Sequence, residues 1–379
     1  MTGVGPAGRA GNTALHQPRS VAAQLVAGAA YMRAEQYNDA FICYSRAIAA
    51  DPNSYEGQLG LARVCAYLGN VADGLEAARQ ARALKPAEGG PRITSGLLKL
   101  ASFRGLKDPK EQLKVLTEAA KLLDAGVRIA ADDPDGWKGL GEARARLAQV
   151  RLETLRAAAA RGQQTSQAAD QQISTDLAGA ITAYQRARTY SPQEADLSYA
   201  LGRLYQAQGQ PDAAEKSLRE ATRLAPQNPA YQVALAWLLI GRGKDPQTAR
   251  EAAQTALQLG ETTGEAALAG AVALLKQGDA RAAIKEITGL LRQYGEKPDL
   301  LYWYGEALLG LDPREAAADP ELKDLDPLRR AVAAYEVLER QVLQGAPCRA
   351  TPQDVRNLRD RLAARMKAAM AQAPPGKAR

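Results

Sequence analysis

A repeat with a period of 34 residues constrains the fold of this chain more than any other feature. Segments 21–54, 55–88 and 195–228 place small, aromatic and proline residues at matching offsets. The matching residues are Gly28, Tyr31, Ala40, Tyr44, Ala47 and Pro52 in the first segment, Leu61, Ala62, Gly69, Ala81 and Pro86 in the second, and Leu201, Gly202, Tyr205, Gly209, Ala214, Leu218, Ala221 and Pro226 in the third. A fixed period of this length indicates one supersecondary unit stacked along the chain.

The spacing of these residues has a physical explanation. Small residues at offsets 8, 20 and 27 let two helices approach closely, and bulkier residues at offsets 7, 11 and 24 fill the space between units. Proline at offset 32 ends the second helix, because it lacks an N–H group and restricts the residue before it. The pattern resembles the tetratricopeptide repeat, a helix-turn-helix unit. This resemblance implies an all-α, right-handed α-solenoid of about eight helix pairs.

Less regular copies follow, and together they predict the domain organisation. We expect a flexible arm over 1–20, a solenoid over 21–350, a capping helix over 351–371 and a disordered tail over 372–379. The capping helix has Thr351 as its predicted N-cap residue.

Three parts of the predicted solenoid depart from the repeat. Residues 89–133 form an irregular unit whose register stays open. An extended unit over 134–194 has a long first helix at 137–160, a polar loop and a second helix at 174–190. An inserted loop is predicted at about 311–326.

Composition agrees with a helical protein and restricts its partners. Apolar residues make up 46% of the chain and aromatic residues only 5%, with alanine and leucine dominant. The net charge is +7, of which residues 1–20 contribute +2 and residues 351–379 contribute +5. Because the body between them is neutral, it lacks the basic face typical of a nucleic-acid binder. The basic C-terminal helix keeps open an alternative RNA-associated or membrane-associated role.

The residues needed for catalysis are scarce. The only histidine is His16, in the predicted arm, and the cysteines are Cys43, Cys65 and Cys348. We therefore expect no enzyme activity, no metal site and no cofactor. Cys43 and Cys65 are predicted to be small buried residues, and Cys348 a free surface thiol.

The predicted compartment is the cytoplasm of a bacterium. Residues 1–20 contain no apolar core of a secretion signal, and no run of 18 apolar residues occurs. An envelope or periplasmic assembly factor is the alternative if a leader is missing from this chain.

The resemblance also implies a binding surface. In the tetratricopeptide family the first helix of each unit lines a concave groove, with offsets 2, 5, 9, 12 and 13 facing into it. We expect a protein or peptide partner there, and a scaffold or assembly-adaptor function. The candidate residues are Arg63, Tyr67, Glu142, Arg146, Tyr199, Arg203, Trp237, Tyr302 and Glu306. Aromatic and arginine residues commonly anchor interfaces, although the same rings could instead pack against a neighbouring unit.

Two further hypotheses concern the partner. Family members that clamp a C-terminal carboxylate use lysine and asparagine at positions held here by Leu25 and Ala29, so this subtype is not supported. The later half of helix 137–160 carries Leu152 and Leu155, which could serve dimerisation or a partner, or could pack on residues 89–133.

Overall fold

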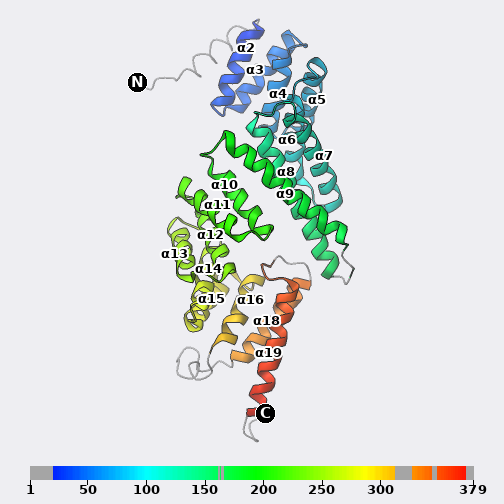
Figure 1. Cartoon of the computed structure of the whole chain (residues 1–379). Helices are drawn as coiled ribbons and strands as arrows, with labels where there is room; N and C mark the ends of the chain where they lie inside the picture. Colours follow the sequence, from blue (N-terminus) through cyan, green and yellow to red (C-terminus); the bar gives the residue numbers. More distant parts are fainter. Residues whose placement is uncertain (1–19, 161–162, 164–165, 312–326, 344–347, 373–379) are drawn as a thin grey trace, which may run out of the picture. The chain divides into compact units, whose positions relative to one another are not determined.

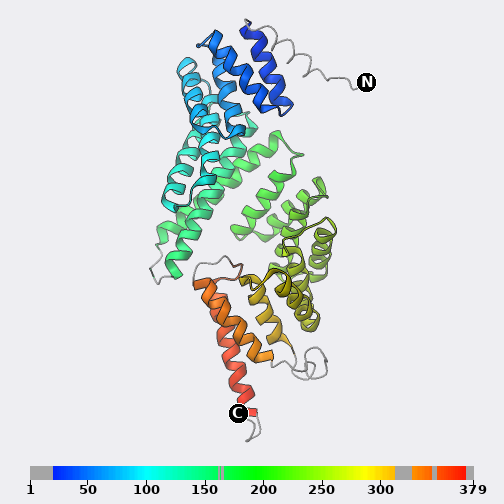
Figure 2. The same ribbon diagram turned by 180° about the vertical axis from the view of Figure 1, so that it is seen from behind.

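The computed structural model describes residues 20–160, 163, 166–311, 327–343 and 348–372. Within these residues the regular structure is helical, with seventeen α-helices and one short 3₁₀-helix arranged mainly as hairpins (Figures 1 and 2). The chain divides into two compact units. Unit 1 comprises residues 1–156 and 164–208, and unit 2 comprises residues 157–163 and 209–379.

Unit 1 contains helices α2 to α10, which pack as successive antiparallel neighbours. The helices are α2 (Val21–Arg33), α3 (Tyr37–Ala50), α4 (Tyr55–Leu68), α5 (Val71–Leu84), α6 (Gly90–Ser102), η1 (Phe103–Gly105), α7 (Pro109–Val127), α8 (Pro134–Ala160), α9 (Gln167–Tyr190) and α10 (Ala195–Ala207). Each of α2, α4 and α6 packs on its following helix, and α4 also contacts both α2 and α6. The first helices of successive pairs therefore lie side by side.

Tyr44 shows how the small residues of the repeat determine this packing. Its ring comes from α3 and lies against both α2 and α4. A Cβ atom at Gly28 would lie 2.9 Å from the Tyr44 ring, and one at Gly60 would clash with it more severely. Glycine at these two positions thus makes room for one tyrosine that joins three helices.

Local signals set the helix ends, and the prolines at the ends of second helices act as the sequence predicts. Ser54 is the N-cap of α4, and its hydroxyl accepts a hydrogen bond of 3.1 Å from the backbone N–H of Gly57. At the other end, α3 stops at Ala50, two residues before Pro52. Helices α5, α9 and α11 end in the same relation to their prolines.

The middle of unit 1 departs from the bounds of the preceding helix pairs. Residues 89–133 form a helix pair, α6 and the longer α7, joined by the 3₁₀ turn. The predicted polar loop is wrong in extent, because α9 already begins at Gln167 with Ser166 as its N-cap. Helices α8 and α9 are 27 and 24 residues long, and Arg151 and Asp176 form an ion pair that links their distal halves.

Leu152 and Leu155, in the later half of α8, are both half-buried rather than exposed. Earlier in this helix, Leu147 belongs to a core that also includes Leu116 and Leu123 of α7, and each of the three is at most 4% exposed. This earlier part of α8 thus uses its apolar side inside unit 1.

Unit 2 continues the pairwise pattern. The helices are α11 (Pro211–Leu224), α12 (Pro229–Arg242), α13 (Pro246–Gln258), α14 (Glu265–Lys276), α15 (Ala280–Tyr294), α16 (Pro298–Gly310), α18 (Pro327–Leu343) and α19 (Pro352–Gln372). Here α14 contacts both α12 and α16, so the first helices again lie side by side. None of the described helices is long and apolar enough to cross a membrane.

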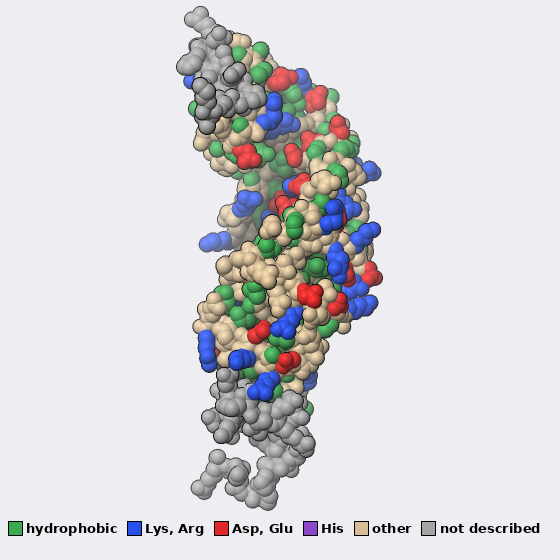
Figure 3. Space-filling model, turned by 90° about the vertical axis from the view of Figure 1, so that its left-hand side faces the viewer, with side chains coloured by type: hydrophobic (Ala, Val, Ile, Leu, Met, Phe, Trp, Pro, Cys, Tyr) green, Lys and Arg blue, Asp and Glu red, His purple; other side chains and the backbone are tan. Residues whose placement is uncertain are grey.

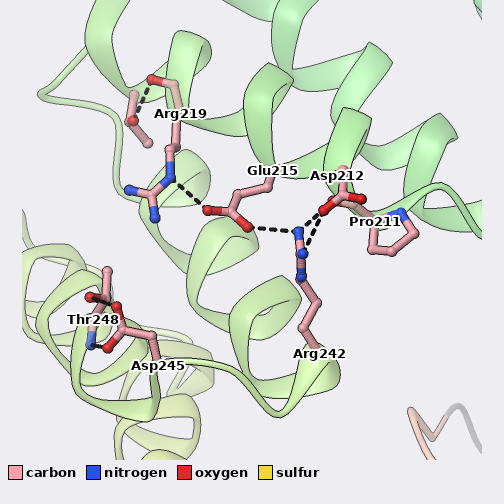
Figure 4. Close-up of polar contacts among 8 residues, drawn as sticks. Pro211, Asp212, Glu215, Arg219, Arg242, Asp245 and Thr248 are labelled. Atoms are coloured by element: carbon pink, nitrogen blue, oxygen red, sulfur yellow. Dashed lines mark hydrogen bonds and ion pairs between the residues drawn. The ribbon is translucent and has the colours of Figure 1, made fainter.

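An arginine joins the first two helices of unit 2 (Figure 4). Arg242 ends α12, and its side chain is only 12% exposed. It forms ion pairs with Asp212 at 2.6 Å and Glu215 at 2.7 Å, both on α11, and donates to the carbonyl of Pro211 at 3.1 Å. Glu215 also pairs with Arg219 at 2.9 Å. The guanidinium thereby ties the end of α12 to two carboxylates and one carbonyl at the start of α11.

Helix α19 covers the end of unit 2. It packs on α18 and α16, and Val355, Leu358 and Leu362 are at most 4% exposed. Thr351 and Asp354 cap it reciprocally: the Thr351 hydroxyl accepts from the Asp354 N–H at 3.1 Å, and the Asp354 carboxylate accepts from the Thr351 N–H at 2.7 Å. The predicted arm (1–20), inserted loop (about 311–326) and tail (372–379) lie outside the described residues except for positions 20, 311 and 372.

Candidate functional site

Two of the predicted groove residues, both on α4, form an exposed aromatic and cationic patch in unit 1. Tyr67 is 60% exposed, and its ring stacks on that of Tyr37 with 4.5 Å between the ring centroids and 6° between the planes. Arg63, one turn earlier, is exposed and makes no hydrogen bond or ion pair with another described residue. A tyrosine pair beside an unpaired guanidinium is a composition suited to an interface.

Neighbouring side chains affect the electrostatics of this patch. Burial is the largest cause of a raised pKa at Tyr67, followed by the nearby charge of Asp135. Asp135 belongs to the first turn of α8 and is exposed, and burial and Asp133 raise its pKa, while Lys138 and Arg63 oppose that rise. We call Tyr37, Arg63, Tyr67 and Asp135 the α4 patch.

The neighbouring charges are already paired. Lys138 forms an ion pair with Glu194 across unit 1, and the side chains are 43% and 32% exposed. Burial by itself lowers the pKa of Lys138, but the bond to Glu194 and the charges of Glu194, Asp196 and Asp135 together raise it. The α4 patch therefore adjoins a neutralised pair rather than a second free cation.

Glu142 and Arg146, also predicted for the groove, satisfy each other on α8. Their ion pair is 2.8 Å long, with 35% and 33% of the respective side chains exposed. The Arg146 guanidinium also lies 5.2 Å from the centre of the Phe103 ring. The charges of both residues are therefore already engaged by contacts within α8 and with Phe103.

Tyr199 and Arg203 lie together on α10. The Arg203 guanidinium donates a hydrogen bond of 3.2 Å to the Tyr199 hydroxyl. Arg203 is exposed, and Tyr199 is half-buried. This part of unit 1 offers a second exposed guanidinium, supported by an aromatic neighbour.

The predicted groove residues of unit 2 are covered by the chain itself. Trp237 is only 8% exposed, and the Arg349 guanidinium lies 4.3 Å from its ring centre, which agrees with the alternative that this ring packs within the protein. Both carboxylate oxygens of Glu306 accept hydrogen bonds from Arg361 of α19, at 2.7 and 2.8 Å.

Tyr302 is the third of these groove residues. It is half-buried and packs edge-on against Trp303, with the ring centroids 5.1 Å apart. The C-terminal segment 348–361 therefore accounts for the contacts of Trp237 and Glu306, and only unit 1 keeps predicted groove residues such as Tyr67 well exposed.

The described residues offer little reactive chemistry. They contain no group of three or more histidine, cysteine and acidic residues that could hold a metal ion. Cys43 and Cys65 are fully buried, and burial raises the pKa of the Cys65 thiol to about 11. Cys348 donates to the Asp299 carboxylate at 3.4 Å, and its pKa is raised to about 12, mainly by burial. His16 lies outside the described residues.

Some contributing residues were missed at the sequence level. Tyr37 opens the second helix of its pair, and Asp135 falls outside the groove offsets, so neither position pointed to the patch. Arg349 lies outside the repeat altogether. A tyrosine at the start of a second helix, just beyond a turn, is the one signal that could have indicated Tyr37.

Sequence profiles described as tetratricopeptide repeats match residues 25–89, 173–238 and 268–327, about half of the chain in total. The chain is a tetratricopeptide repeat protein. Proteins of this family generally act as protein-interaction scaffolds and are typically non-catalytic. No curated protein matches this tetratricopeptide repeat protein.

Many solved structures resemble this tetratricopeptide repeat protein, at low identity. A protein from Parabacteroides merdae is 13% identical with a TM-score of 0.48, covering 82% of this chain and 99% of that one. TTC0263 from Thermus thermophilus is 20% identical with a TM-score of 0.43, covering 58% of this chain and 100% of that one. PilF from Pseudomonas aeruginosa is 14% identical with a TM-score of 0.44, covering 66% and 95%.

Proposed function

We propose that this protein is a non-catalytic scaffold or assembly adaptor that binds a segment of a partner protein on the first-helix face of unit 1. The observation that carries the proposal is the α4 patch. Tyr67 is 60% exposed and stacked on Tyr37, beside Arg63, whose guanidinium has no ion pair within the part of the chain that the structure describes. Stacked rings lose little conformational entropy on binding, so they are effective anchors for a peptide.

Charge supports a partner segment with an acidic residue near an apolar one. Arg63 supplies a guanidinium that makes no hydrogen bond or ion pair with another described residue, and the Tyr37–Tyr67 stack supplies an apolar surface. Asp135 restricts where a carboxylate can lie, because its own negative charge would repel one. The acidic residue of the partner would therefore lie toward Arg63 and away from α8.

Site-specific photo-cross-linking tests this proposal. A benzoylphenylalanine at position 67 is expected to capture a discrete protein in native cells, and capture is expected to disappear with Arg63→Glu. The matched control places the same photo-reactive residue at position 79 on α5, where the native arginine side chain is 62% exposed. With the purified partner, Arg63→Ala is expected to raise the Kd at least tenfold, about 1.4 kcal/mol.

Two outcomes would contradict the proposal. One is recovery of the same proteins from positions 67 and 79, which indicates nonspecific proximity. The other is capture at position 67 that persists with Arg63→Glu while circular dichroism shows that the variant is folded. In either case the α4 patch is not the working surface.

A role in RNA or membrane binding through α19 is less supported. Arg361 is paired with Glu306, and Arg359 is paired with Asp360 at 3.0 Å, which reduces the free positive charge of this helix. Acidic and basic side chains are interspersed on the face drawn in Figure 3. A steep loss of RNA affinity between 50 and 200 mM salt, on the order of tenfold or more, would favour the RNA role instead.

The compartment is proposed to be the bacterial cytoplasm, with the periplasm as the alternative. Cys43, Cys65 and Cys348 are free thiols, as expected in a reducing compartment. Fractionation of the native organism with an antibody against this chain would distinguish the two locations.

A further inference from the structure

Arg349 bridges three successive first helices of unit 2. Its guanidinium lies 4.3 Å from the Trp237 ring centre on α12 and pairs with Glu265 on α14 at 2.5 Å. Its backbone N–H donates to the Asp299 carboxylate on α16 at 2.6 Å. A residue that precedes the terminal helix thus lies across the face on which the sequence predicts a partner.

Two tryptophan side chains near Arg349, Trp237 and Trp303, have indole N–H groups without hydrogen-bond partners among the described residues. The Trp237 and Trp303 rings lie 6.4 Å apart, and both indole N–H groups are buried without an acceptor among the described residues. Trp237 itself is 92% buried. Buried polar groups in proteins are nearly always paired, so two orphaned donors in one cluster are unusual. A peptide backbone supplies a carbonyl acceptor at every residue.

A cavity of about 500 Å³ adjoins the Arg349 site. Its walls include Glu265, Leu268, Tyr294 and Asp299, which combine two carboxylates with apolar and aromatic surface. The opposing cation is Lys297, which lies 5.0 Å from the Tyr294 ring centre. This volume falls within the range of ligand pockets and leaves room beside the arginine for flanking residues.

An arginine of another chain could make the same contacts that hold the Arg349 side chain. Its side chain is 38% exposed and that of Glu265 is 55% exposed, so their ion pair is screened by solvent. The same chemistry, a guanidinium over a tryptophan and against a carboxylate, can be supplied by another chain.

We propose that this face of unit 2 binds an arginine-containing segment of a partner protein, and that Arg349 occupies the guanidinium position in cis. The inference depends on residues of unit 2 only, so it does not require the α4 patch of unit 1 to be functional. A tethered residue competes at an effective concentration on the order of millimolar, so the partner must displace Arg349 to bind.

A synthetic peptide provides the test. The probe copies residues 346–352 with serine in place of cysteine, Ala-Pro-Ser-Arg-Ala-Thr-Pro, and carries a fluorophore for anisotropy. The Arg349→Ala protein is expected to bind it at least tenfold more tightly than the wild type. Replacing the arginine of the probe by alanine is expected to abolish this binding.

Matched variants identify the acceptor. In the Arg349→Ala background, Glu265→Gln is expected to weaken binding of the probe at least fivefold. Glu251→Gln on α13 is expected to leave the affinity for the probe unchanged. If circular dichroism shows that the Arg349→Ala protein does not fold, Arg349→Gln serves in its place. This variant also removes the guanidinium but keeps the start of the side chain.

Three results would overturn the proposal. The first is that the probe binds the wild type and the Arg349→Ala protein with equal affinity. The second is that the probe with alanine in place of arginine binds as well as the original probe. The third is that Glu265→Gln does not change the affinity for the probe. Loss of cross-linking at position 67 would bear only on unit 1, so the two proposals can fail separately.

Discussion

The guanidinium of Arg349 lies over the indole of Trp237, 4.3 Å from the centre of the ring, and this contact covers one of the three tryptophans of the chain. Arg349→Ala removes that cover, so water should reach the Trp237 ring. We expect a red shift of the tryptophan emission maximum and stronger quenching by acrylamide, while the circular dichroism spectrum stays unchanged.

Arg223→Ala is the control for this measurement. Arg223 pairs with Glu220 on the surface of α11, and its side chain is 65% exposed. Its removal is expected to leave both emission and quenching as in the wild type. An Arg349→Ala spectrum that superimposes on the wild type would show that Trp237 is shielded by other groups.

Gly60 and Tyr44 give a prediction about packing within unit 1. A Cβ at position 60 would collide with the Tyr44 ring, so Gly60→Ala is expected to lower the free energy of unfolding by about 1–3 kcal/mol. The direction is informative because glycine to alanine in an open helix position would instead stabilise by about 1 kcal/mol. Urea unfolding followed by circular dichroism measures the change.

Gly289, which is exposed inside α15, offers the matched position for that experiment. A Cβ there would meet no atom within 4 Å, so Gly289→Ala should raise the free energy of unfolding by up to about 1 kcal/mol. If both glycine variants behave alike, close approach to Tyr44 is not what requires glycine at position 60.

Much of the fold could be predicted from the sequence because each repeat carries its own local signals. Pro52 lies two residues after the end of α3, and small residues such as Gly28 mark the contacts between helices. The start of α9 was missed because residues 167–172 are polar and read as a loop. In the structure they form a solvated helix, whose polar composition carries no apolar periodicity to detect.

The candidate site was predictable only in part, for a different physical reason. Offsets within a repeat identify which side of a helix a residue occupies, and the structure places Arg63 and Tyr67 on the exposed side of α4, where their role in binding stays a prediction. Offsets cannot say what another segment places on that side. Arg349 and Arg361 precede or belong to the terminal helix, and only their tertiary contacts reveal that Trp237 and Glu306 are covered.

The Arg242 cluster yields a stability prediction for unit 2. Arg242→Ala leaves Glu215, whose side chain is 24% exposed, without its partner on α12. We expect a loss of about 1–3 kcal/mol in the free energy of unfolding, because one member of a half-buried charged network is removed. Arg223→Ala, which breaks a pair on the exposed surface of α11, should cost less than about 1 kcal/mol. Equal losses in the two variants would show that burial of Arg242 adds nothing.

The Cys65 thiol links stability to alkaline pH. Its pKa is raised to about 11 by burial, whereas an unfolded cysteine titrates near ~8.5. The folded chain therefore keeps a proton that the unfolded chain releases. Stability from this group is fully present below the unfolded pKa and is lost as pH rises toward the folded pKa. Between pH 8 and pH 10 the wild type should lose about 1–2 kcal/mol more than Cys65→Ala.

Urea unfolding at the two pH values measures this difference, and the subtraction removes the contributions of tyrosines and lysines that titrate in the same range. Reaction with a thiol reagent gives an independent reading, since the thiolate is the reacting species. Cys65 should react at pH 8 only as fast as the chain unfolds, and urea should accelerate it. Rapid labelling of Cys65 in the folded protein, or identical pH dependence of the two proteins, would mean that this thiol is more hydrated than its complete burial between α4 and its neighbours implies.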